Sequence, residues 1–396
     1  MSAASSSGDA ADVAKAAPSS VAPATDGKDS LLEKSFYEMR RTGPYVLAWA
    51  VLSVSLSMYN SEILNTRHNR FPYPFFYTLW HMVVQTTAMS VVFCIFPSWQ
   101  RPTLKQFRVQ WRLLIAMALA CAVSVGGENY ALTMVTLTVH ESMKSAVPVL
   151  TMCFAFIFES RYYSLTLILA VVGLASSTVA VQAGAITHQI GINSALGIIV
   201  TGISSGSAAL RPVIIALLLR EQDDSPALTP LVIVWYEGIF TGPVYLAFWA
   251  CTAERDESII YMRAHLADSL AYIGAGCAMA FFYAIAVNWL IRVTSSLTTT
   301  VLGTVKHVTL TCFSAILVDQ IFLSDNPPTL IVLGLLGYIP AIVGYSYLML
   351  THQAYNDDGY AEVRKTLAAL PGLGCCWRGD GGRTEGSALL SVGTKA

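Results

Sequence analysis

Long apolar stretches, separated by short polar segments, follow one another along most of the chain. Each is about 20 residues long, which is the length of helix that crosses the hydrocarbon core of a bilayer. Several polar links hold only a few residues, so the helices that they join must be antiparallel neighbours. We therefore predict an all-α polytopic membrane protein with ten transmembrane helices, at residues 44–64, 74–97, 112–133, 136–158, 163–183, 194–219, 229–251, 269–291, 297–319 and 329–350.

The two ends of the chain differ in composition from the predicted helices. Residues 1–43 are expected to form a disordered cytosolic tail, because residues 1 to about 30 are rich in Ala, Ser and Asp. Within it, residues 30–41 place large apolar side chains on one helical face, which predicts a short amphipathic helix on the membrane surface. Residues 44–350 are expected to form the ten-helix membrane domain, and residues 351–396 a second tail.

The positive charges of the loops predict the orientation. Lys and Arg are concentrated in the loops that lie on the same side as the N-terminus. By the positive-inside rule that side is cytosolic, and an even number of spans places the C-terminus there too. The N-terminal tail has neither the apolar core of a signal peptide nor the acid-poor composition of a transit peptide. We therefore expect both termini in the cytosol and no import into plastids or mitochondria; together with the family resemblance given below, this implies a Golgi or ER membrane.

The composition agrees with a membrane protein and argues against several other classes. Hydrophobic residues make up 54% of the 396 residues and charged residues 12%, whereas about 25% of a soluble domain is charged. No basic patch with interleaved aromatic residues suggests a nucleic-acid partner. The eight cysteines have neither zinc-site nor disulfide-framework spacing. The sequence shows no nucleophile with a base, no metal cluster and no phosphate-binding glycine loop, so no metal, no cofactor and no enzyme activity are expected. Cys375 and Cys376, in the C-terminal tail, are candidates for lipidation.

A short internal repeat gives the first indication of a functional site. The segments TLTVHESMK (136–144) and TTTVLGTVK (298–306) both read T-x-T-V-x-x-x-x-K. They open the fourth and ninth predicted helices, so they occupy equivalent places in two halves of five helices each. Because five is odd, the second half is inverted relative to the first, as in many secondary transporters whose substrate site lies between the halves. We predict two inverted five-helix repeats.

The repeat contributes one lysine from each half, Lys144 and Lys306. A lysine at the centre of a spanning helix costs roughly 3 kcal/mol on insertion scales, so two at equivalent positions indicate a function. Two ammonium groups that face one cavity attract an anion, and lysine is a good partner for phosphate. His307, about 100° around the helix from Lys306, is expected to reach the same anion. The rest of the substrate site is predicted to consist of Asn129, Tyr130, Tyr283 and Asn288.

Two acidic residues leave other interpretations open. Glu141 precedes Lys144 by three residues and lies on the same helical face, so a purely structural ion pair is an alternative to a ligand site. Arg211 is expected to form a structural pair with Glu237, which would hold two helices together.

Four motifs in order resemble those of one known family. They are FPYPFFYTLWHMVVQ (71–85), NYALTMVTLTVHESMKSAVPVLT (129–151), LIRVTSSLTTTVLGTVKHV (290–308) and LGLLGYIPAIVGYSYL (333–348). The family is that of the triose-phosphate translocators and nucleotide-sugar transporters, in the drug/metabolite transporter superfamily. The resemblance implies a ten-helix antiporter for phosphorylated solutes, with Lys144 and Lys306 as substrate-binding lysines.

One departure from the family pattern bears on the substrate. Plastid sugar-phosphate translocators of this family carry Lys-Arg in the ninth helix, where this chain has Lys306-His307. Loss of a bidentate cation argues against triose phosphate, so the leading expectation is exchange of a nucleotide sugar for a nucleoside monophosphate. A sugar-phosphate/phosphate antiporter is the alternative, and a non-transporting membrane scaffold a more distant one. The expected partners are the phosphorylated substrate, its counter-substrate and the lipid bilayer, and a homodimer stays open.

Overall fold

A computed structural model of the chain describes residues 27–64, 71–135, 137–186, 195–220, 227–317 and 329–350. All regular elements within these ranges are helical, and none is a strand. The prediction of an all-α protein is thereby confirmed for the described residues. Most of the two predicted tails, at residues 1–26 and 351–396, lies outside them, as do Cys375 and Cys376.

The chain divides into two compact units, residues 1–41 and residues 42–396, and the description below concerns the second. The described helices are α1 (Gly27–Leu64), α2 (Pro74–Ile95), α3 (Leu104–Cys121), the π-helical turn η1 (Ala122–Gly126), α4 (Gly127–Leu132), α5 (Leu137–Met143), the 3₁₀ turn η2 (Lys144–Ala146), α6 (Val147–Phe158), α7 (Leu165–Ile186), α8 (Ala195–Leu218), α9 (Pro230–Cys251), α10 (Glu254–Ala264), α11 (Leu266–Val293), α12 (Ser296–Leu317) and α13 (Thr329–Leu350).

Six helical stretches in the described part of the chain are long and apolar enough to cross a membrane. They are Thr42–Leu64, Pro74–Ile95, Leu104–Leu132, Ala195–Leu218, Pro230–Cys251 and Leu266–Val293. Shorter apolar helices occur at Val147–Phe158, Leu165–Ala180 and Leu336–Met349. These findings support a polytopic membrane protein, whereas the number of ten spans and the inverted repeat stay predictions.

The elements differ from the prediction in several places, and three of the differences are described here. The helix predicted to begin at residue 112 begins at Leu104, because the side chains of Thr103 and Gln106 form a capping box there. The surface helix predicted at 30–41 is part of α1, which continues through Pro44. The short helix α10 was not predicted from hydrophobicity, but its first turn holds three acidic residues, which favour a helix N-terminus.

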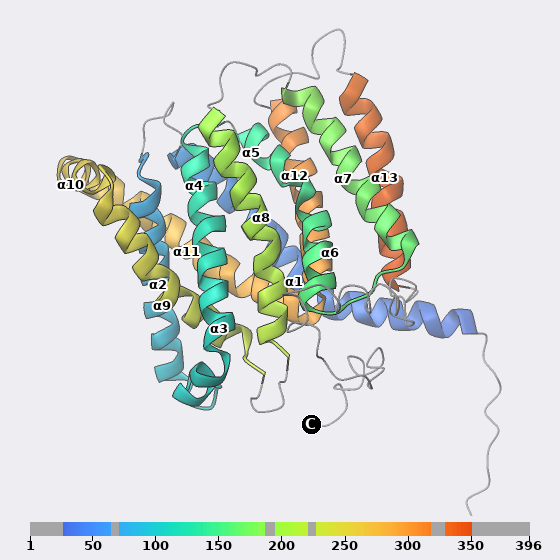
Figure 1. Cartoon of the computed structure of the whole chain (residues 1–396), viewed down its shortest axis with the longest axis horizontal. Coiled ribbons are helices and arrows are strands. Elements are labelled where there is room, and N and C mark those ends of the chain that lie inside the picture. Colours follow the sequence, from blue (N-terminus) through green and yellow to red (C-terminus); the bar gives the residue numbers. More distant parts are fainter. Residues whose placement is uncertain are drawn as a thin grey trace, which may run out of the picture. The chain divides into compact units, whose positions relative to one another are not determined.

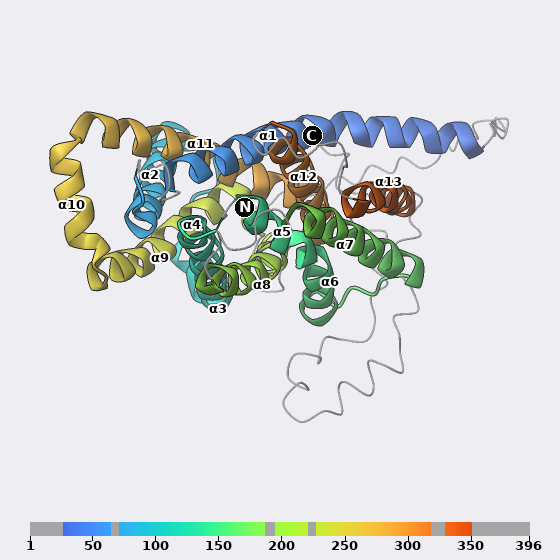
Figure 2. The same cartoon turned by 90° about the horizontal axis from the view of Figure 1, so that it is seen from above.

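The helices of the second unit form two groups on either side of α8. Figures 1 and 2 show α2, α3, α9 and α11 on one side and α6, α7, α12 and α13 on the other. The closest pairings are α2 with α9 and α7 with α13. Each group has its own apolar core, with Leu114, Ile215 and Leu290 buried in the first and Leu167 and Val301 in the second. Residues of both groups line the cavity described below.

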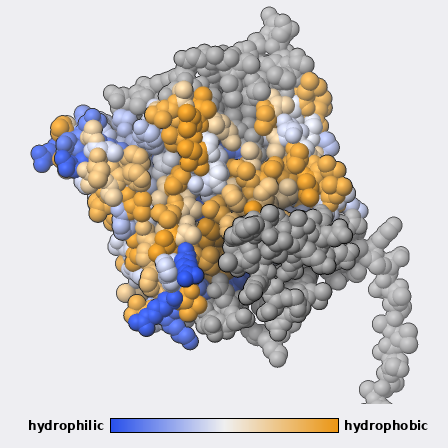
Figure 3. Space-filling view, in the orientation of Figure 1, coloured by the Kyte–Doolittle hydropathy of each residue, from blue (hydrophilic) through white to orange (hydrophobic). Residues whose placement is uncertain are grey.

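The surface of the described helices is largely apolar, as expected for contact with lipid. Leu196, Ile199 and Ile203 lie on one face of α8 and are 53%, 59% and 60% exposed. In Figure 3 such apolar surface covers the middle of the visible helices, and hydrophilic residues gather at α10 and at the start of α3. Contiguous exposed apolar surface of this kind marks a membrane or partner contact, and the helix lengths favour the membrane.

Candidate substrate-binding cavity

A cavity of about 210 Å³ lies among the helices of the second unit. Its wall is built by α1, α2, α8, α9, α11 and α12, together with the chain from the end of α3 to the start of α6. The charged residues that line it are Glu128, Glu141, Lys144, Arg211, Glu237 and Lys306. No side chain among these six is more than 25% exposed. Buried charges in membrane-spanning segments are expensive and normally functional.

Lys144 lies at a break in its helix. α5 ends at Met143, and the 3₁₀ turn η2 separates it from α6. Pro148, in the first turn of α6, has no N–H to bond to the Lys144 carbonyl, which accepts instead from the N–H of Val147. Broken helices of this kind are typical of substrate sites in transporters, because irregular backbone in a membrane lines a cavity or is buried in protein.

The π-helical turn η1 shapes the chain just before Glu128 and Asn129, which both line the cavity. Such turns are rare and frequently occur at functional sites. The hydroxyl of Tyr245 lies 3.2 Å from the carbonyl oxygens of Cys121 and of Ala122. A side chain of α9 thus supports the irregular backbone that directs α4 toward the cavity.

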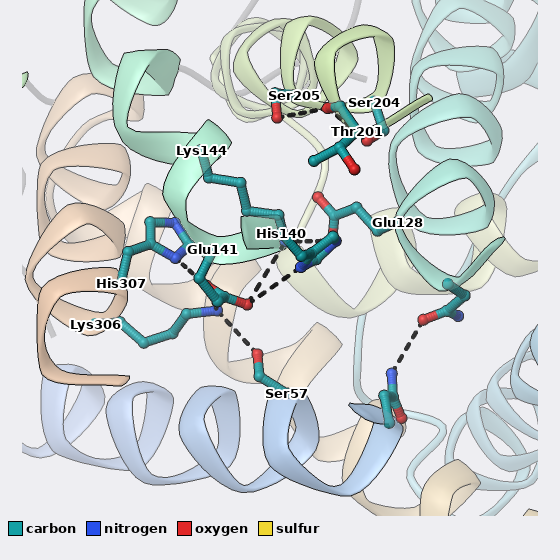
Figure 4. Close-up of polar contacts among 12 residues, drawn as sticks. Ser57, Glu128, His140, Glu141, Lys144, Thr201, Ser204, Ser205, Lys306 and His307 are labelled. Carbon is teal, nitrogen blue, oxygen red and sulfur yellow. Dashed lines mark hydrogen bonds and ion pairs between the residues drawn. The ribbon is translucent and has the colours of Figure 1, made fainter. Parts of the chain in front are cut away.

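Glu141 lies between the two lysines that the repeat singled out (Figure 4). Its Oε2 is 3.7 Å from the Lys306 Nζ, and its Oε1 is 4.0 Å from the Lys144 Nζ. The same Oε2 is hydrogen-bonded to the Nδ1 of His307, and Oε1 lies 3.5 Å from the Nδ1 of His140. α5 and α12 therefore meet at one carboxylate, which is 1% exposed.

Each lysine also has a second partner. The Nζ of Lys144 lies 2.9 Å from the Oε2 of Glu128, and the Nζ of Lys306 donates to the Oγ of Ser57 at 3.0 Å. The alternative pair of Glu141 with Lys144 is present, but Glu128 is the closer partner of that lysine. Carboxylates thus contact both of the amines that are predicted to bind an anion. An incoming anion must compete with those carboxylates.

The structure divides the predicted substrate residues into two groups. Those that line the cavity are Lys144, Lys306, His307, Asn129 and Tyr283. Tyr130 and Asn288 are not among the described residues that line it. Tyr130 stacks on Phe75 with ring centroids 5.4 Å apart, and Asn288 donates its side-chain amide to the Ala284 carbonyl at 2.8 Å. Both residues thus contact neighbouring parts of the helix bundle.

Asn129 is held in a hydrogen-bonded network that links three helices. Its Oδ1 accepts from the Nδ2 of Asn60 at 3.1 Å, and its Nδ2 donates to the Oγ1 of Thr78 at 2.8 Å. The Asn60 Oδ1 in turn accepts from the Tyr77 hydroxyl at 2.9 Å. Both ends of the Asn129 amide are therefore engaged by α1 and α2, which favours a structural role for it in the cavity wall.

The predicted ion pair of Arg211 with Glu237 is confirmed, with 2.6 Å between the Arg211 Nη2 and the Glu237 Oε1. Other cavity residues were not predicted as site residues, namely Ser57, His81, Gln85 and Glu128. A histidine, a glutamine and a glutamate inside apolar stretches are themselves a signal, because such side chains face the protein interior in membrane proteins. Ser57 carries no such signal, since a serine hydroxyl can bond to its own helix.

The fold and the cavity define a multi-pass membrane protein with a buried, charged internal site. Two Arabidopsis thaliana proteins, each named a probable sugar phosphate/phosphate translocator, are similar to the chain. One is 23% identical over 287 residues, covering 71% of this chain and 67% of the relative. The other is 23% identical over 310 residues, covering 76% and 81%.

No protein-family model matches the chain. The homologues are nevertheless named as translocators and not as enzymes. Their names favour the sugar-phosphate alternative over the expected nucleotide-sugar exchange.

Proposed function

We propose that the protein is a secondary transporter that exchanges a sugar phosphate for inorganic phosphate across a membrane. The observation that carries the proposal is the convergence of Lys144 and Lys306 on one point of a buried cavity, where both amines lie within 4.0 Å of Glu141. Lysines bind phosphate as point charges. The names of the two relatives support the same class of substrate.

The phosphate is proposed to bind where the Glu141 carboxylate lies, between the two amines. One contact between unit charges at about 4 Å is worth roughly 4 kcal/mol at an effective dielectric constant near 20, before desolvation is subtracted. His307 shares the Glu141 carboxylate with Lys306, so its imidazole is placed to contact the same phosphate. Tyr283 lines the same cavity and offers a hydroxyl to the sugar.

The size of the cavity also favours a small ligand. Pockets for drug-sized ligands typically measure about 300–1,000 Å³, and this cavity measures about 210 Å³. A sugar phosphate has one ring or chain and one phosphate, whereas a nucleotide sugar has two sugars, a base and two phosphates. The volume therefore supports the smaller substrate class.

The test is counter-exchange by the purified full-length chain in liposomes. Vesicles preloaded with inorganic phosphate are expected to take up labelled sugar phosphates, and unloaded vesicles are not. Lys306→Ala is expected to slow this exchange at least tenfold, which corresponds to about 1.4 kcal/mol of lost substrate interaction. The control is Lys105→Ala, which removes an exposed lysine at the start of α3 and is expected to leave exchange unchanged.

Exchange that Lys306→Ala leaves at the wild-type rate would contradict the site. Exchange of nucleotide sugars for UMP or GMP, without competition by phosphate alone, would instead support the nucleotide-sugar class. Failure to move any phosphorylated solute would favour the scaffold. Ten spans in two inverted halves, both termini in the cytosol and a Golgi or ER location belong to the same proposal, and the distribution of Lys and Arg supports the orientation.

A further inference from the structure

The charges that line the cavity balance one another. Its cations are Lys144, Arg211 and Lys306, and its carboxylates are Glu128, Glu141 and Glu237. With the histidines neutral, the formal charge of the wall is zero. A phosphate monoester or inorganic phosphate is close to a dianion at neutral pH, because its second pKa is about 6. Binding of this dianion leaves two uncompensated negative charges in a buried site, which is costly.

Glu141 stands where the dianion must bind. It contacts both Lys306 and His307 through Oε2, and Lys144 through Oε1. Its side chain is 1% exposed, so bulk water does not solvate the carboxylate at this position. A phosphate that takes over these cations leaves Glu141 as a buried carboxylate without its counter-charges. Such a group becomes neutral by taking up a proton.

We propose that Glu141 takes up a proton from solvent when phosphate binds to Lys144, Lys306 and His307, so that the protein carries its substrate together with a proton. This inference rests on the proposed function. In the step, the hydrogen bond between the Glu141 Oε2 and the His307 Nδ1 breaks, and the incoming proton forms an O–H bond on the Glu141 carboxyl. The imidazole is then free to donate to a phosphate oxygen. No covalent bond of the substrate changes.

The groups that face Glu141 are mainly the cations that a bound phosphate would take over. On its own segment they are His140 and Lys144. From α12 they are Lys306 and His307. Glu128 of α4 faces it across Lys144.

The other residues labelled in Figure 4 carry hydroxyl groups. Ser57 of α1 accepts a hydrogen bond from Lys306, and Thr201, Ser204 and Ser205 of α8 bond to carbonyl groups of their own helix. Tyr283 of α11 also lines the cavity. Glu128 is 25% exposed and contacts one of the two lysines, Lys144. Glu141 alone among the described carboxylates contacts both lysines. It is therefore the carboxylate that a bound phosphate displaces.

The experiment counts protons as inorganic phosphate binds to the purified full-length protein. Calorimetric titrations at about pH 8, where phosphate is a dianion, are run in buffers that differ in ionisation enthalpy. The dependence of the measured heat on the buffer gives the number of protons taken up per phosphate. We expect a number close to one. By linkage, the dissociation constant for phosphate is expected to rise about tenfold per pH unit as the pH increases.

Three variants locate the proton. Glu141→Gln keeps the size of the side chain but cannot take up a proton, so proton uptake is expected to fall to near zero and affinity to become independent of pH. Glu128→Gln is expected to keep the proton uptake. Glu257→Gln removes an exposed carboxylate on α10 and is expected to behave as wild type.

The possible outcomes separate the two proposals. Phosphate binding without proton uptake in the wild type would overturn proton coupling and leave the exchange function standing. Proton uptake retained by Glu141→Gln would place the proton on the phosphate or on another group of the cavity, and loss in Glu128→Gln would place it on Glu128, so either result would overturn the assignment. Absence of any phosphate binding would overturn both proposals. If Glu141→Gln does not fold, the titration of the wild type is repeated with sulfate in place of phosphate. Sulfate stays divalent, so any proton taken up on sulfate binding is taken up by the protein.

Discussion

Arg211 of α8 and Glu237 of α9 are joined by two close contacts to one carboxylate oxygen. The Arg211 Nε donates to the Glu237 Oε1 at 2.7 Å, and the Arg211 Nη2 lies 2.6 Å from the same oxygen. The pair lies in the cavity wall, with Glu237 1% and Arg211 14% exposed. Two charges buried together in this way neutralise each other, and loss of one partner leaves the other uncompensated.

We expect Glu237→Leu to destabilise the protein by about 3–5 kcal/mol, because it leaves the Arg211 guanidinium buried without a counter-charge. The double variant Arg211→Met, Glu237→Leu is expected to recover most of that loss. Thermal unfolding in detergent, combined in a double-mutant cycle, measures both effects. Asp256→Asn, which breaks the exposed pair with Arg255 on α10, is the control and is expected to leave the unfolding midpoint unchanged. Equal losses in the single and double variants would contradict the pairing.

Asn129 is expected to act on stability more than on substrate affinity. Asn129→Ala removes one hydrogen-bond partner from each of the buried side chains of Asn60 and Thr78, which costs about 1–3 kcal/mol. Thermal unfolding is expected to show this loss, while the dissociation constant for phosphate changes little. Ser176→Ala, which removes an exposed hydroxyl bonded to its own helix on α7, is the matched control. A large rise in the dissociation constant with unchanged stability would indicate direct substrate contact.

The carboxylate of Glu254 makes part of the stability depend on pH. It begins α10, and its Oε1 accepts from the N–H of Phe76 in the first turn of α2 at 2.6 Å. Burial raises the pKa of this carboxyl from 4.5 to about 7, although the backbone hydrogen bonds act in the opposite direction. Because the folded-state pKa lies above the unfolded value, this contribution to stability is complete below about pH 4.5 and is lost as the pH rises through about 7.

We therefore expect the unfolding temperature of the wild type to decrease as the pH is raised from about 5 to about 8. The part of this decrease that is due to Glu254 is expected to be absent in Glu254→Gln. The substituted amide keeps an oxygen that accepts from Phe76 but cannot ionise. Thermal unfolding across this range measures the difference between the two proteins. Asp256→Asn, which changes an exposed carboxylate on the same helix, should retain the pH dependence. If the Glu254→Gln variant follows the wild-type curve, Glu254 is not the group responsible.

The sequence was sufficient to predict where most helices lie, because the length of an apolar stretch is set by the bilayer. The helix at α2 was predicted to begin at residue 74 and does so, and α13 has the predicted bounds. The helix α10 was not predicted, since it is short and rich in charge and has no apolar run to reveal it. Its position depends on contacts with α2 and α9, which the local sequence does not contain.

The candidate site could be predicted only in part. The pattern of hydrophobic residues does not determine how each helix is rotated about its own axis, and this rotation decides which side chains face the cavity. Asn129 and Tyr130 are neighbours, and successive residues of a helix point about 100° apart. One therefore lines the cavity while the other stacks on Phe75. The partner of Lys144 was missed for a similar reason. Glu128 lies on a separate helix beyond a π-helical turn, so only the folded chain brings the two together.

A final prediction concerns the contact between α11 and α2. A Cβ at Gly276 would collide with the ring and hydroxyl of Tyr77, which is fully buried and hydrogen-bonded to Asn60. Gly276→Ala is therefore expected to destabilise the protein by about 1–3 kcal/mol through overpacking. Gly274, two residues earlier on the same helix, has open space where its Cβ would lie, so Gly274→Ala should be neutral or stabilise by up to about 1 kcal/mol. Thermal unfolding of the two variants compares them directly, and equal midpoints would contradict the close packing of α11 on Tyr77.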